Sequence, residues 1–284
     1  MSPISRAAGW MAGWLSLMVI IAVAGREATR ELAVFQIMEM RSLIGLVMLW
    51  PLVHAGGGLA AMKSLRWPQH ALRNAVHYAA QYGWFVALTL IPLAQVVAIE
   101  FTMPIWTALL AIAFLGERMN AWKALAIALG LVGVALIVRP AASAISAGQL
   151  IALAAALGFA VSVTLTKSLT RTESAVRIIF WMLVVQSLLG LLPALAVWRW
   201  PSPPVWGWVV VIAFCGTFSH YCMTRAMRHA EATVVVPMDF LRVPLTALAG
   251  WLVYAERIDA LTVLGTALIL GANLLNLRRS APKA

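Results

Sequence analysis

Five charged side chains lie within stretches of sequence that are otherwise apolar: Glu39, Arg41, Glu100, Asp239 and Arg242. If these stretches lie in lipid, a charge near the bilayer centre costs about 2.5–3.5 kcal/mol on insertion scales, so it normally faces a cavity or a partner. A carboxylate can accept from an ammonium group, and a guanidinium can bind a carboxylate. The set is therefore suited to binding a small charged molecule. The alternative is that the acids are interfacial charges that reach water.

Glu39 and Arg41 are two positions apart, so a helix would direct them to nearly opposite faces. We expect at most one of them to face a central cavity. The other would serve as a gating charge or as part of a structural ion pair.

Two apolar segments also carry polar residues at helical spacing. The first stripe comprises Asn74, His77, Tyr78 and Gln81, with Tyr82 beside it, and the second comprises Thr217, His220, Tyr221 and Thr224. A polar stripe in a membrane helix either lines a watery cavity or forms hydrogen bonds to a neighbouring helix. Because the stripes occupy matching places in the two halves of the chain, we favour a cavity.

The match between the halves extends over a long stretch. Residues 100–118 (EFTMPIWTALLAIAFLGER) align with residues 239–257 (DFLRVPLTALAGWLVYAER) after a shift of 139 positions. The same shift pairs Gln81 with His220 and Tyr82 with Tyr221. Glu117-Arg118 and Glu256-Arg257 are predicted to mark helix ends, whereas Glu100 and Asp239 are the functional candidates at the other ends of these segments.

The composition places the chain in lipid. It is 63% hydrophobic and 11% charged, against roughly 45–50% and 25% for a soluble domain. Apolar segments lie at about 9–25, 32–53, 70–90, 93–115, 121–138, 147–167, 175–198, 205–224, 233–254 and 260–277, each long enough to span the hydrocarbon core. We therefore predict an all-α integral membrane protein of ten transmembrane helices.

The distribution of positive charge predicts the orientation. Fourteen Lys and Arg residues lie on the side of the N-terminus and five lie on the other side. Under the positive-inside rule both termini are then cytoplasmic. The net charge of +11 is explained by topology, so we expect no nucleic-acid partner.

Five helices in each half is an odd number, so the second half must enter the membrane from the opposite side. We predict two inverted-topology repeats, residues 6–139 and 140–279, around a central cavity. The segments at 121–138 and 260–277 are rich in Ala and Gly, and these we expect to pack closely as scaffold.

Motifs for enzymes and cofactors are missing from the sequence. There is no nucleotide-binding G-x-x-x-x-G-K-[ST], no H-E-x-x-H and no G-x-S-x-G. Neither His77 nor His220 has a second His, Cys or acid at i+3 or i+4, so no metal site is expected, and no cofactor. Cys215 and Cys222 are seven residues apart on one predicted helix, too far for a disulfide.

Taken together, the two five-helix units and their acidic-Arg exits (Gly116-Glu117-Arg118; Ala255-Glu256-Arg257) resemble the EamA-type permeases of the drug/metabolite transporter superfamily. So do the following helices rich in Ala, Gly and Leu. Arg41 stands where such permeases often carry arginine. Its counterpart in the second half, from the match of Ser42-Leu43 with Ser187-Leu188, is Gln186 instead.

The resemblance implies a basket of helices around a cavity and export of small metabolites, commonly amino acids, from bacteria. Our leading hypothesis is an exporter of amino acids, aromatic ones included, in the inner membrane, working by alternating access. The expected substrate-binding residues are His77, Tyr78, Gln81, Tyr82, Glu100, His220, Tyr221, Asp239 and Arg242. Besides the substrate and the lipids, a proton on a cavity histidine or carboxylate is a candidate coupling ion.

Three alternatives remain open at this point. The chain could expel drugs, organic cations or nucleotide-like metabolites. It could be an integral-membrane enzyme that uses His77, His220 and the carboxylates, or a structural or receptor protein without a substrate.

Overall fold

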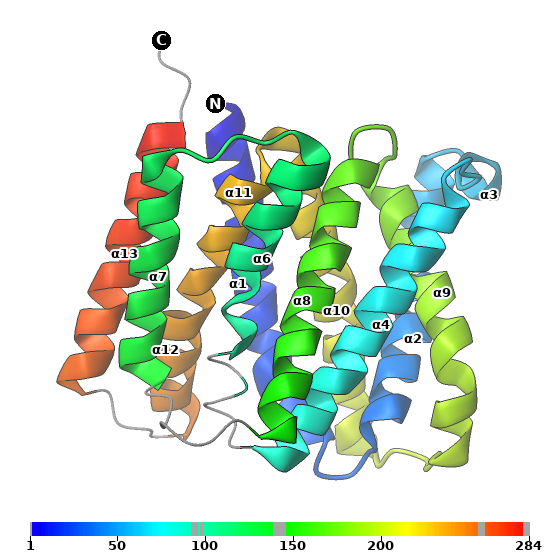
Figure 1. Ribbon diagram of the computed structural model, residues 1–284. Helices are drawn as coiled ribbons and strands as arrows, with labels where there is room; N and C mark the ends of the chain where they lie inside the picture. Colours follow the sequence, from blue (N-terminus) through cyan, green and yellow to red (C-terminus); the bar gives the residue numbers. More distant parts are fainter. Residues whose placement is uncertain (1, 92–95, 97–98, 139–145, 255–258, 281–284) are drawn as a thin grey trace.

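The computed structural model describes residues 2–91, 96, 99–138, 146–254 and 259–280. Within these residues the chain is helical, with no strand, so the predicted all-α fold class is confirmed (Figure 1). The elements are α1 (Pro3–Ala28), α2 (Val34–Ala55), α3 (Gly58–Ala61), α4 (Trp67–Leu90), α6 (Met103–Leu110), η1 (Ala111–Leu115), α7 (Ala121–Val138), α8 (Ala147–Leu169), α9 (Ala175–Ala196), α10 (Pro203–His229), α11 (Ala232–Val235), η2 (Val236–Leu241), α12 (Arg242–Tyr254) and α13 (Ala260–Ser280).

Local sequence sets where several helices begin. Ser2 and Ser174 accept hydrogen bonds from the third residue of α1 and of α9, and Ser146 with Gln149 forms a capping box at α8. These side chains satisfy backbone N–H groups that have no partner inside the helix. Proline stands in the first turn of α4 and α10, where its missing N–H costs nothing.

Successive long helices run in alternate directions (Figure 1). We call the end of the bundle at which α1 begins and α13 finishes the upper end, as it is drawn there, and the opposite end the lower end. From the upper end, α1, α4, α7, α9 and α12 run downward, and α2, α6, α8, α10 and α13 run upward. Consequently α1 and α8, which open the two predicted repeats, point in opposite directions.

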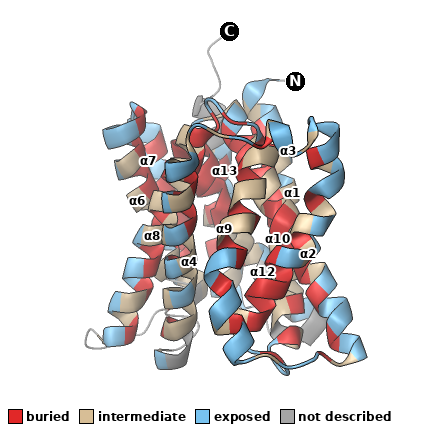
Figure 2. Cartoon of the chain, turned by 90° about the vertical axis from the view of Figure 1, so that its right-hand side faces the viewer, coloured by how far each residue is buried: buried red, intermediate tan, exposed pale blue. Residues whose placement is uncertain are grey.

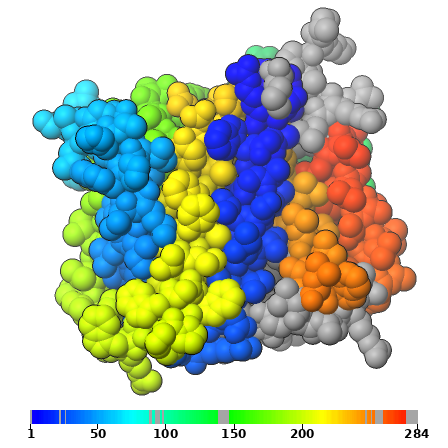
Figure 3. Space-filling model, turned by 180° about the vertical axis from the view of Figure 1, so that it is seen from behind, coloured from blue at the N-terminus to red at the C-terminus, as the bar shows by residue number. Residues whose placement is uncertain are grey.

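Four helix pairs make the most extensive contacts. They are α1 with α10, α4 with α8, α2 with α9, and α7 with α13. Figure 3 shows α1 beside α10 along the back of the molecule. Each pair joins a helix of the first half of the chain to a helix of the second half, so the two halves are packed together throughout.

The contact of α7 with α13 is made by glycine. A Cβ atom on Gly133 would lie 2.7 Å from the Gly265 carbonyl oxygen, and one on Gly265 would lie 2.6 Å from the Gly133 oxygen. Only residues without a side chain let two backbones approach so closely. The predicted close packing of these two helices is confirmed.

Apolar side chains cover the outside of the bundle, as expected of a surface in lipid. Val47, Phe114 and Leu192 are each about three-quarters exposed, at 73, 75 and 77%. Buried residues lie toward the middle, where the helices face one another (Figure 2). Of the described helices, six are long and apolar enough to cross a membrane and three shorter ones are also apolar.

Two of the predicted continuous segments are broken. Within 93–115, a turn at Phe101 and Thr102 precedes α6, which ends in the π-helical turn η1. Within 233–254, the 3₁₀ segment η2 separates α11 from α12. Pro104, Pro237 and Pro244 lie close to these breaks and cannot donate a helical hydrogen bond, which accounts for the departure from a single helix. Glu100 directly precedes the first break, and Asp239 lies in η2.

Candidate functional site

The two broken helices bring three of the predicted charges into one ion-paired group. Arg242 Nη2 lies 2.7 Å from Glu100 Oε1 and 3.0 Å from Asp239 Oδ2. The guanidinium also lies over the Phe101 ring, 5.1 Å from its centroid. One arginine therefore holds the two acids that the sequence alignment pairs with each other.

Two tryptophans extend this group. Trp14 Nε1 donates to Asp239 Oδ1 at 2.8 Å, and Trp84 Nε1 donates to Glu100 Oε2 at 2.8 Å. Asp239 is 3% exposed, whereas the side chains of Glu100 and Arg242 are 15% and 18% exposed. The acids are thus held inside the protein by specific partners, which excludes the reading in which both are free interfacial charges.

Both acids lie where the winding of the helix changes. The turn after Glu100 and the 3₁₀ winding around Asp239 change the direction of the side chains and leave backbone groups outside the α-helical pattern. In membrane proteins such discontinuous helices occur where the backbone is surrounded by protein or lines a cavity. The breaks therefore mark the region of the fold that is suited to binding.

The predicted histidines of the two polar stripes meet. The ring centroids of His77 on α4 and His220 on α10 are 5.4 Å apart at an interplanar angle of 85°. His220 also packs edge-on against Trp14 at 5.4 Å, and His77 lies 5.4 Å from Phe159. Ser162 Oγ lies 3.3 Å from His77 Nδ1. Because Trp14 contacts both Asp239 and His220, the histidine pair and the ion-paired group are continuous.

The charges of α2 form a neighbouring group. Arg41 Nη2 donates to Gln186 Oε1 of α9 at 2.6 Å, and its Cδ lies 2.7 Å from the position of a Cβ on Gly216 of α10. The Glu39 carboxylate lies instead beside Gly190 of α9 and the Tyr78 hydroxyl of α4. Both side chains are buried, at 2% and 6% exposure. Glu39 therefore points toward α4 and Arg41 toward α10, and both side chains also reach α9.

The remaining predicted site residues differ in how deeply they are buried. Gln81 is half-buried, and its Oε1 has no hydrogen-bond partner among the described residues. Tyr221 packs against Trp10 at 5.8 Å, with the Arg225 guanidinium 6.0 Å from the Tyr221 ring. Tyr82 is 47% exposed and stacks on Phe35 at 5.1 Å. Tyr82 thus lies apart from the histidine pair, on the outer surface.

Trp14 and Ser162 were not among the residues predicted from the sequence. Trp14 lies in an apolar helix with no polar stripe, and its role depends on an acid 225 positions away. Ser162 lies in a segment of small residues whose spacing gives no sign of a histidine partner. Gln186 was identified only as the counterpart of Arg41, and the structure shows the two side chains hydrogen bonded to each other.

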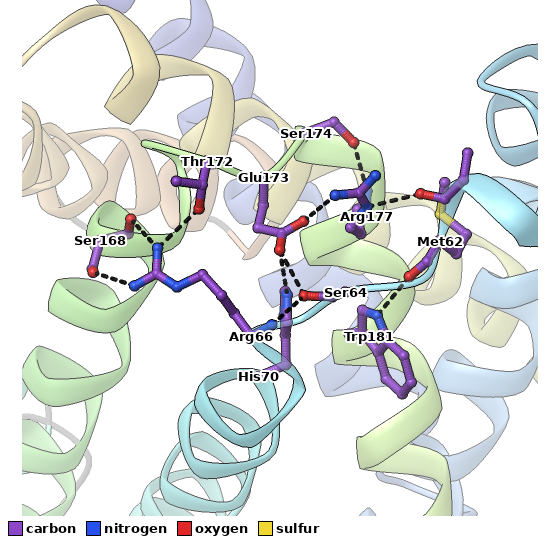
Figure 4. A network of polar contacts seen from close by, with 11 residues as sticks. Met62, Ser64, Arg66, His70, Ser168, Thr172, Glu173, Ser174, Arg177 and Trp181 are labelled. Atoms are coloured by element: carbon purple, nitrogen blue, oxygen red, sulfur yellow. Dashed lines mark hydrogen bonds and ion pairs between the residues drawn. The ribbon is translucent and has the colours of Figure 1, made fainter.

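A polar network joins the halves at the upper end (Figure 4). Glu173, in the turn after α8, accepts from Ser64 at 2.6 Å and from Arg177 at 2.5 Å, and lies 4.0 Å from His70 Nε2. Around it, Arg66 donates to Thr172 and Ser168, Arg177 donates to the Ala61 carbonyl, and Trp181 donates to the Met62 carbonyl. We refer to these residues as the upper clasp.

A smaller set of contacts joins the halves at the lower end. Gln36 exchanges hydrogen bonds with the Arg199 backbone. Glu31 accepts from the Ser202 hydroxyl and backbone N–H, both at 2.6 Å. We refer to these residues as the lower clasp.

Comparison with known sequences gives one family and several relatives. A model of the EamA-like transporter family matches residues 7–139 and again residues 146–278. Over 245 residues the chain is 31% identical to a riboflavin transporter of Brucella anthropi, covering 84% of this chain and 86% of that one. It is 25% identical to an S-adenosylmethionine uptake transporter of Rickettsia prowazekii (84% and 81% covered) and 28% identical to a pseudopaline exporter of Pseudomonas aeruginosa (87% and 87% covered).

A solved crystal structure has the same fold. It superposes with a TM-score of 0.85 over 97% of this chain and 98% of its own, at 18% sequence identity. At that identity the likeness concerns the fold alone.

Proposed function

Because the chain belongs to the EamA-like transporter family and is a multi-pass membrane protein, we propose that it carries a small ring-bearing metabolite across the bacterial inner membrane by alternating access. The names of the family and of the relatives denote transporters of small molecules. The aromatic members of the amino acids, the class that the family resemblance led us to expect, fall within the proposed substrate class, and so do vitamins with heteroaromatic rings.

The proposed architecture is ten membrane-spanning segments in two inverted repeats, residues 6–139 and 140–279. The two family matches, of equal length, support it. The helix pairing supports it as well. If each helix is replaced by its counterpart in the other repeat, the α1–α10 pair becomes the α8–α4 pair, and the α2–α9 and α7–α13 pairs are each converted into themselves. That is the pattern expected of a pseudo-twofold axis in the membrane plane.

Equivalent residues support the same symmetry. Arg41 bonds its own counterpart, Gln186. The Tyr78 hydroxyl lies beside Gly190, and the side chain of Thr217, the counterpart of Tyr78, lies beside Gly45, the counterpart of Gly190. Such reciprocal contacts are what a twofold relation between α2 and α9 would produce.

The proposed orientation has the upper end in the cytoplasm. Described cationic residues gather there, among them Arg66, Lys123, Lys167 and Arg177, whereas the lower end holds fewer. The positive-inside rule assigns the more cationic end to the cytoplasm.

The observation that carries the substrate class is the meeting of His77 and His220 between the aromatic rings of Trp14 and Phe159. Imidazole offers both a flat face and a hydrogen-bonding nitrogen, and aromatic neighbours favour another ring in stacked or edge-on contact. Next to the rings, Arg242 and its two acids can exchange their mutual ion pairs for the charged groups of a substrate. Side chains that can bind a ring therefore lie next to side chains that can bind a charged group.

Alternating access requires that each end of the bundle can close and open in turn. The upper and lower clasps are suited to this task because each contains hydrogen bonds between the first and the second half of the chain. Ser64–Glu173 and Arg66–Thr172 are examples at the upper end, and Gln36–Arg199 and Glu31–Ser202 at the lower end. Opening either end would break the hydrogen bonds of its clasp, each contributing about 0.5–1.5 kcal/mol net, together with apolar contacts between the halves near that end.

The test is flux into proteoliposomes that hold the purified protein. The panel comprises riboflavin, S-adenosylmethionine, the aromatic amino acids and an aliphatic amino acid, each measured in both directions. We expect at least one ring-bearing compound to move faster than in empty liposomes, and the aliphatic control not to. Absence of flux for the whole panel would contradict the proposal.

Variants on one helix then test the site. His220→Ala should lower the flux about tenfold or more, which corresponds to about 1.4 kcal/mol. Val210→Ala, at a 42% exposed position of the same helix, is the matched control and should transport normally. Equal loss in both variants, or loss of protein from the membrane in His220→Ala alone, would indicate a structural role for the histidine.

A further inference from the structure

Unpartnered polar atoms gather where α2 crosses α9 between α4 and α10. Among the described residues, fourteen buried side-chain nitrogen or oxygen atoms have no hydrogen-bond partner, and half of them lie here. They belong to Glu39 (both oxygens), Arg41, Tyr78, Gln186, Ser187 and Thr217. Buried polar groups in proteins nearly always have a hydrogen-bond partner. Such a concentration of unpartnered atoms therefore indicates a place where a bound ion or molecule would supply the missing partners.

The carboxyl group of Glu39 is at the centre of this cluster. A Cβ atom on Gly190 would lie 2.7 Å from Glu39 Oε2 and 3.1 Å from Tyr78 Oη. Glycine at this place in α9 therefore makes room for an acid from α2 and a phenol from α4. Since Glu39 is 2% exposed, water does not reach the carboxyl freely.

An ionised carboxylate in such a place would be costly. Burying a charge without hydrogen bonds or an ion pair costs several kcal/mol, so the group either finds a cation or becomes neutral. Within the described part of the chain Glu39 takes part in no ion pair, and Arg41 directs Nη2 to Gln186. The physical requirement is a bound positive charge at Glu39.

The surrounding charges decide which cation fits. Arg41 on α2, Arg73 and His77 on α4 and His220 on α10 are close enough to interact electrostatically with one another, and Tyr78 interacts with both Glu39 and Arg41. The polar side chains among the buried residues of α9 are the neutral Gln186 and Ser187. No group of three His, Cys, Asp or Glu side chains that could hold a metal ion occurs among the described residues. A proton, which needs one oxygen only, fits these surroundings.

We propose that Glu39, assisted by the Tyr78 hydroxyl, is the proton-binding site that couples transport to the proton gradient. The proton occupies a carboxyl oxygen while α2 and α9 are in contact, and it leaves to water when the two helices separate. This inference rests on the proposed function for its coupling role, because a proton site in a protein without flux would couple nothing.

The first experiment needs no substrate. Infrared difference spectra are recorded on the purified protein in lipid bilayers for the wild type, Glu39→Gln and Glu31→Gln. We expect the carbonyl band of a protonated carboxylic acid, shifted in D2O, to be present in the wild type and in Glu31→Gln and to lose intensity in Glu39→Gln. Equal band intensity in all three proteins at every pH at which they remain folded would overturn the proposal.

The second experiment measures coupling in proteoliposomes, with the panel described above and a pH-sensitive dye inside. In the wild type, the flux should change several-fold when a proton gradient is imposed, and substrate should move protons. In Glu39→Gln the rates with and without the gradient should become equal. Tyr78→Phe, which keeps the ring, should weaken the response without abolishing it, and melting temperatures identify any variant that is merely misfolded.

The outcomes separate the two proposals. If wild-type protein moves none of the compounds, the proposed function fails, and the infrared bands alone decide whether Glu39 holds a proton. If flux occurs and Glu39→Gln responds to the gradient as the wild type does, the function stands and the coupling role of Glu39 is wrong.

Discussion

Some side chains of this protein contact residues that are far from them in the sequence. Arg242 ion-pairs with Asp239, three positions earlier, and with Glu100, 142 positions earlier. A guanidinium is planar and carries five donors, whereas an ammonium is a compact point charge on a flexible stem. At position 242 the geometry of the arginine side chain should therefore matter as much as its positive charge.

Replacing Arg242 with Lys keeps the charge and removes this geometry. We expect the flux to fall about tenfold or more, equivalent to about 1.4 kcal/mol, with membrane abundance retained. Arg228→Lys, at an exposed position near the end of α10, is the control and should be neutral. Normal transport by Arg242→Lys would show that a single positive charge is sufficient at this position.

Glu173 allows a prediction about stability and pH. Burial alone would raise the pKa of its carboxyl, but the hydrogen bonds from Ser64 and Arg177 together lower it below the ordinary value of 4.5. A lowered pKa in the folded protein means that the carboxylate stabilises the fold above about pH 4.5 and that this contribution is lost as the pH falls further. The network of Figure 4 should therefore weaken only in acid.

The measurement is the melting temperature of the wild type and of Glu173→Gln as a function of pH. Near neutral pH the variant should be less stable by about 1–3 kcal/mol, and the difference should shrink below pH 4.5. Glu31→Gln, at an exposed carboxylate, should cost less at neutral pH. A difference for Glu173→Gln that grows as the pH falls would contradict this account.

Whole elements have distinct tasks in this fold. The broken segments around Glu100 and Asp239 position charge, whereas α7 and α13 pack backbone against backbone. Sequence alone predicted the close packing, because small residues recur in both helices. It did not predict the breaks, because an apolar segment containing proline can remain a kinked helix when neighbours satisfy the freed backbone groups.

The close contact of α7 and α13 can be tested with one methyl group. A Cβ on Gly133 would meet the Gly265 carbonyl and Ile269 Cγ1 at 2.7 Å, while one on Gly271 would meet nothing within 4 Å. We expect Gly133→Ala to destabilise the protein by about 1–3 kcal/mol, as overpacking does, and Gly271→Ala to be neutral. Equal melting temperatures for the two variants would show that the helices can move apart without cost.

At the scale of the whole molecule, the two clasps sit at opposite ends of one bundle. If transport requires each end to open in turn, a link across either clasp should stop it. The structure supplies one pair of positions at each end, Ser64 with Glu173 and Glu31 with Ser202.

The prediction is made in a background without the buried free cysteines Cys215 and Cys222. Cysteines at either pair of positions, joined by a short thiol-specific linker, should reduce the flux to that of empty liposomes, and a reductant should restore it. Single-cysteine variants treated in the same way are the controls. Unchanged flux through the linked protein would exclude opening at that end.

The sequence by itself determined the helical class, the positions of the apolar segments and which polar residues lie within them. It could do so because hydrophobic length, positive charge in loops and helical spacing are local properties. The predictions for His77, His220, Glu100, Asp239 and Arg242 came from such local patterns.

Only the tertiary structure decided which of these residues meet. Trp14 joins Asp239 to His220, Tyr82 lies on the outside against Phe35, and Glu39 reaches a gap that Gly190 leaves in another helix. These relations depend on how helices from the two halves pack and on where Pro104, Pro237 and Pro244 interrupt them. A periodic pattern records which face of a helix is polar, but the residue on the facing helix is set by packing across the whole bundle.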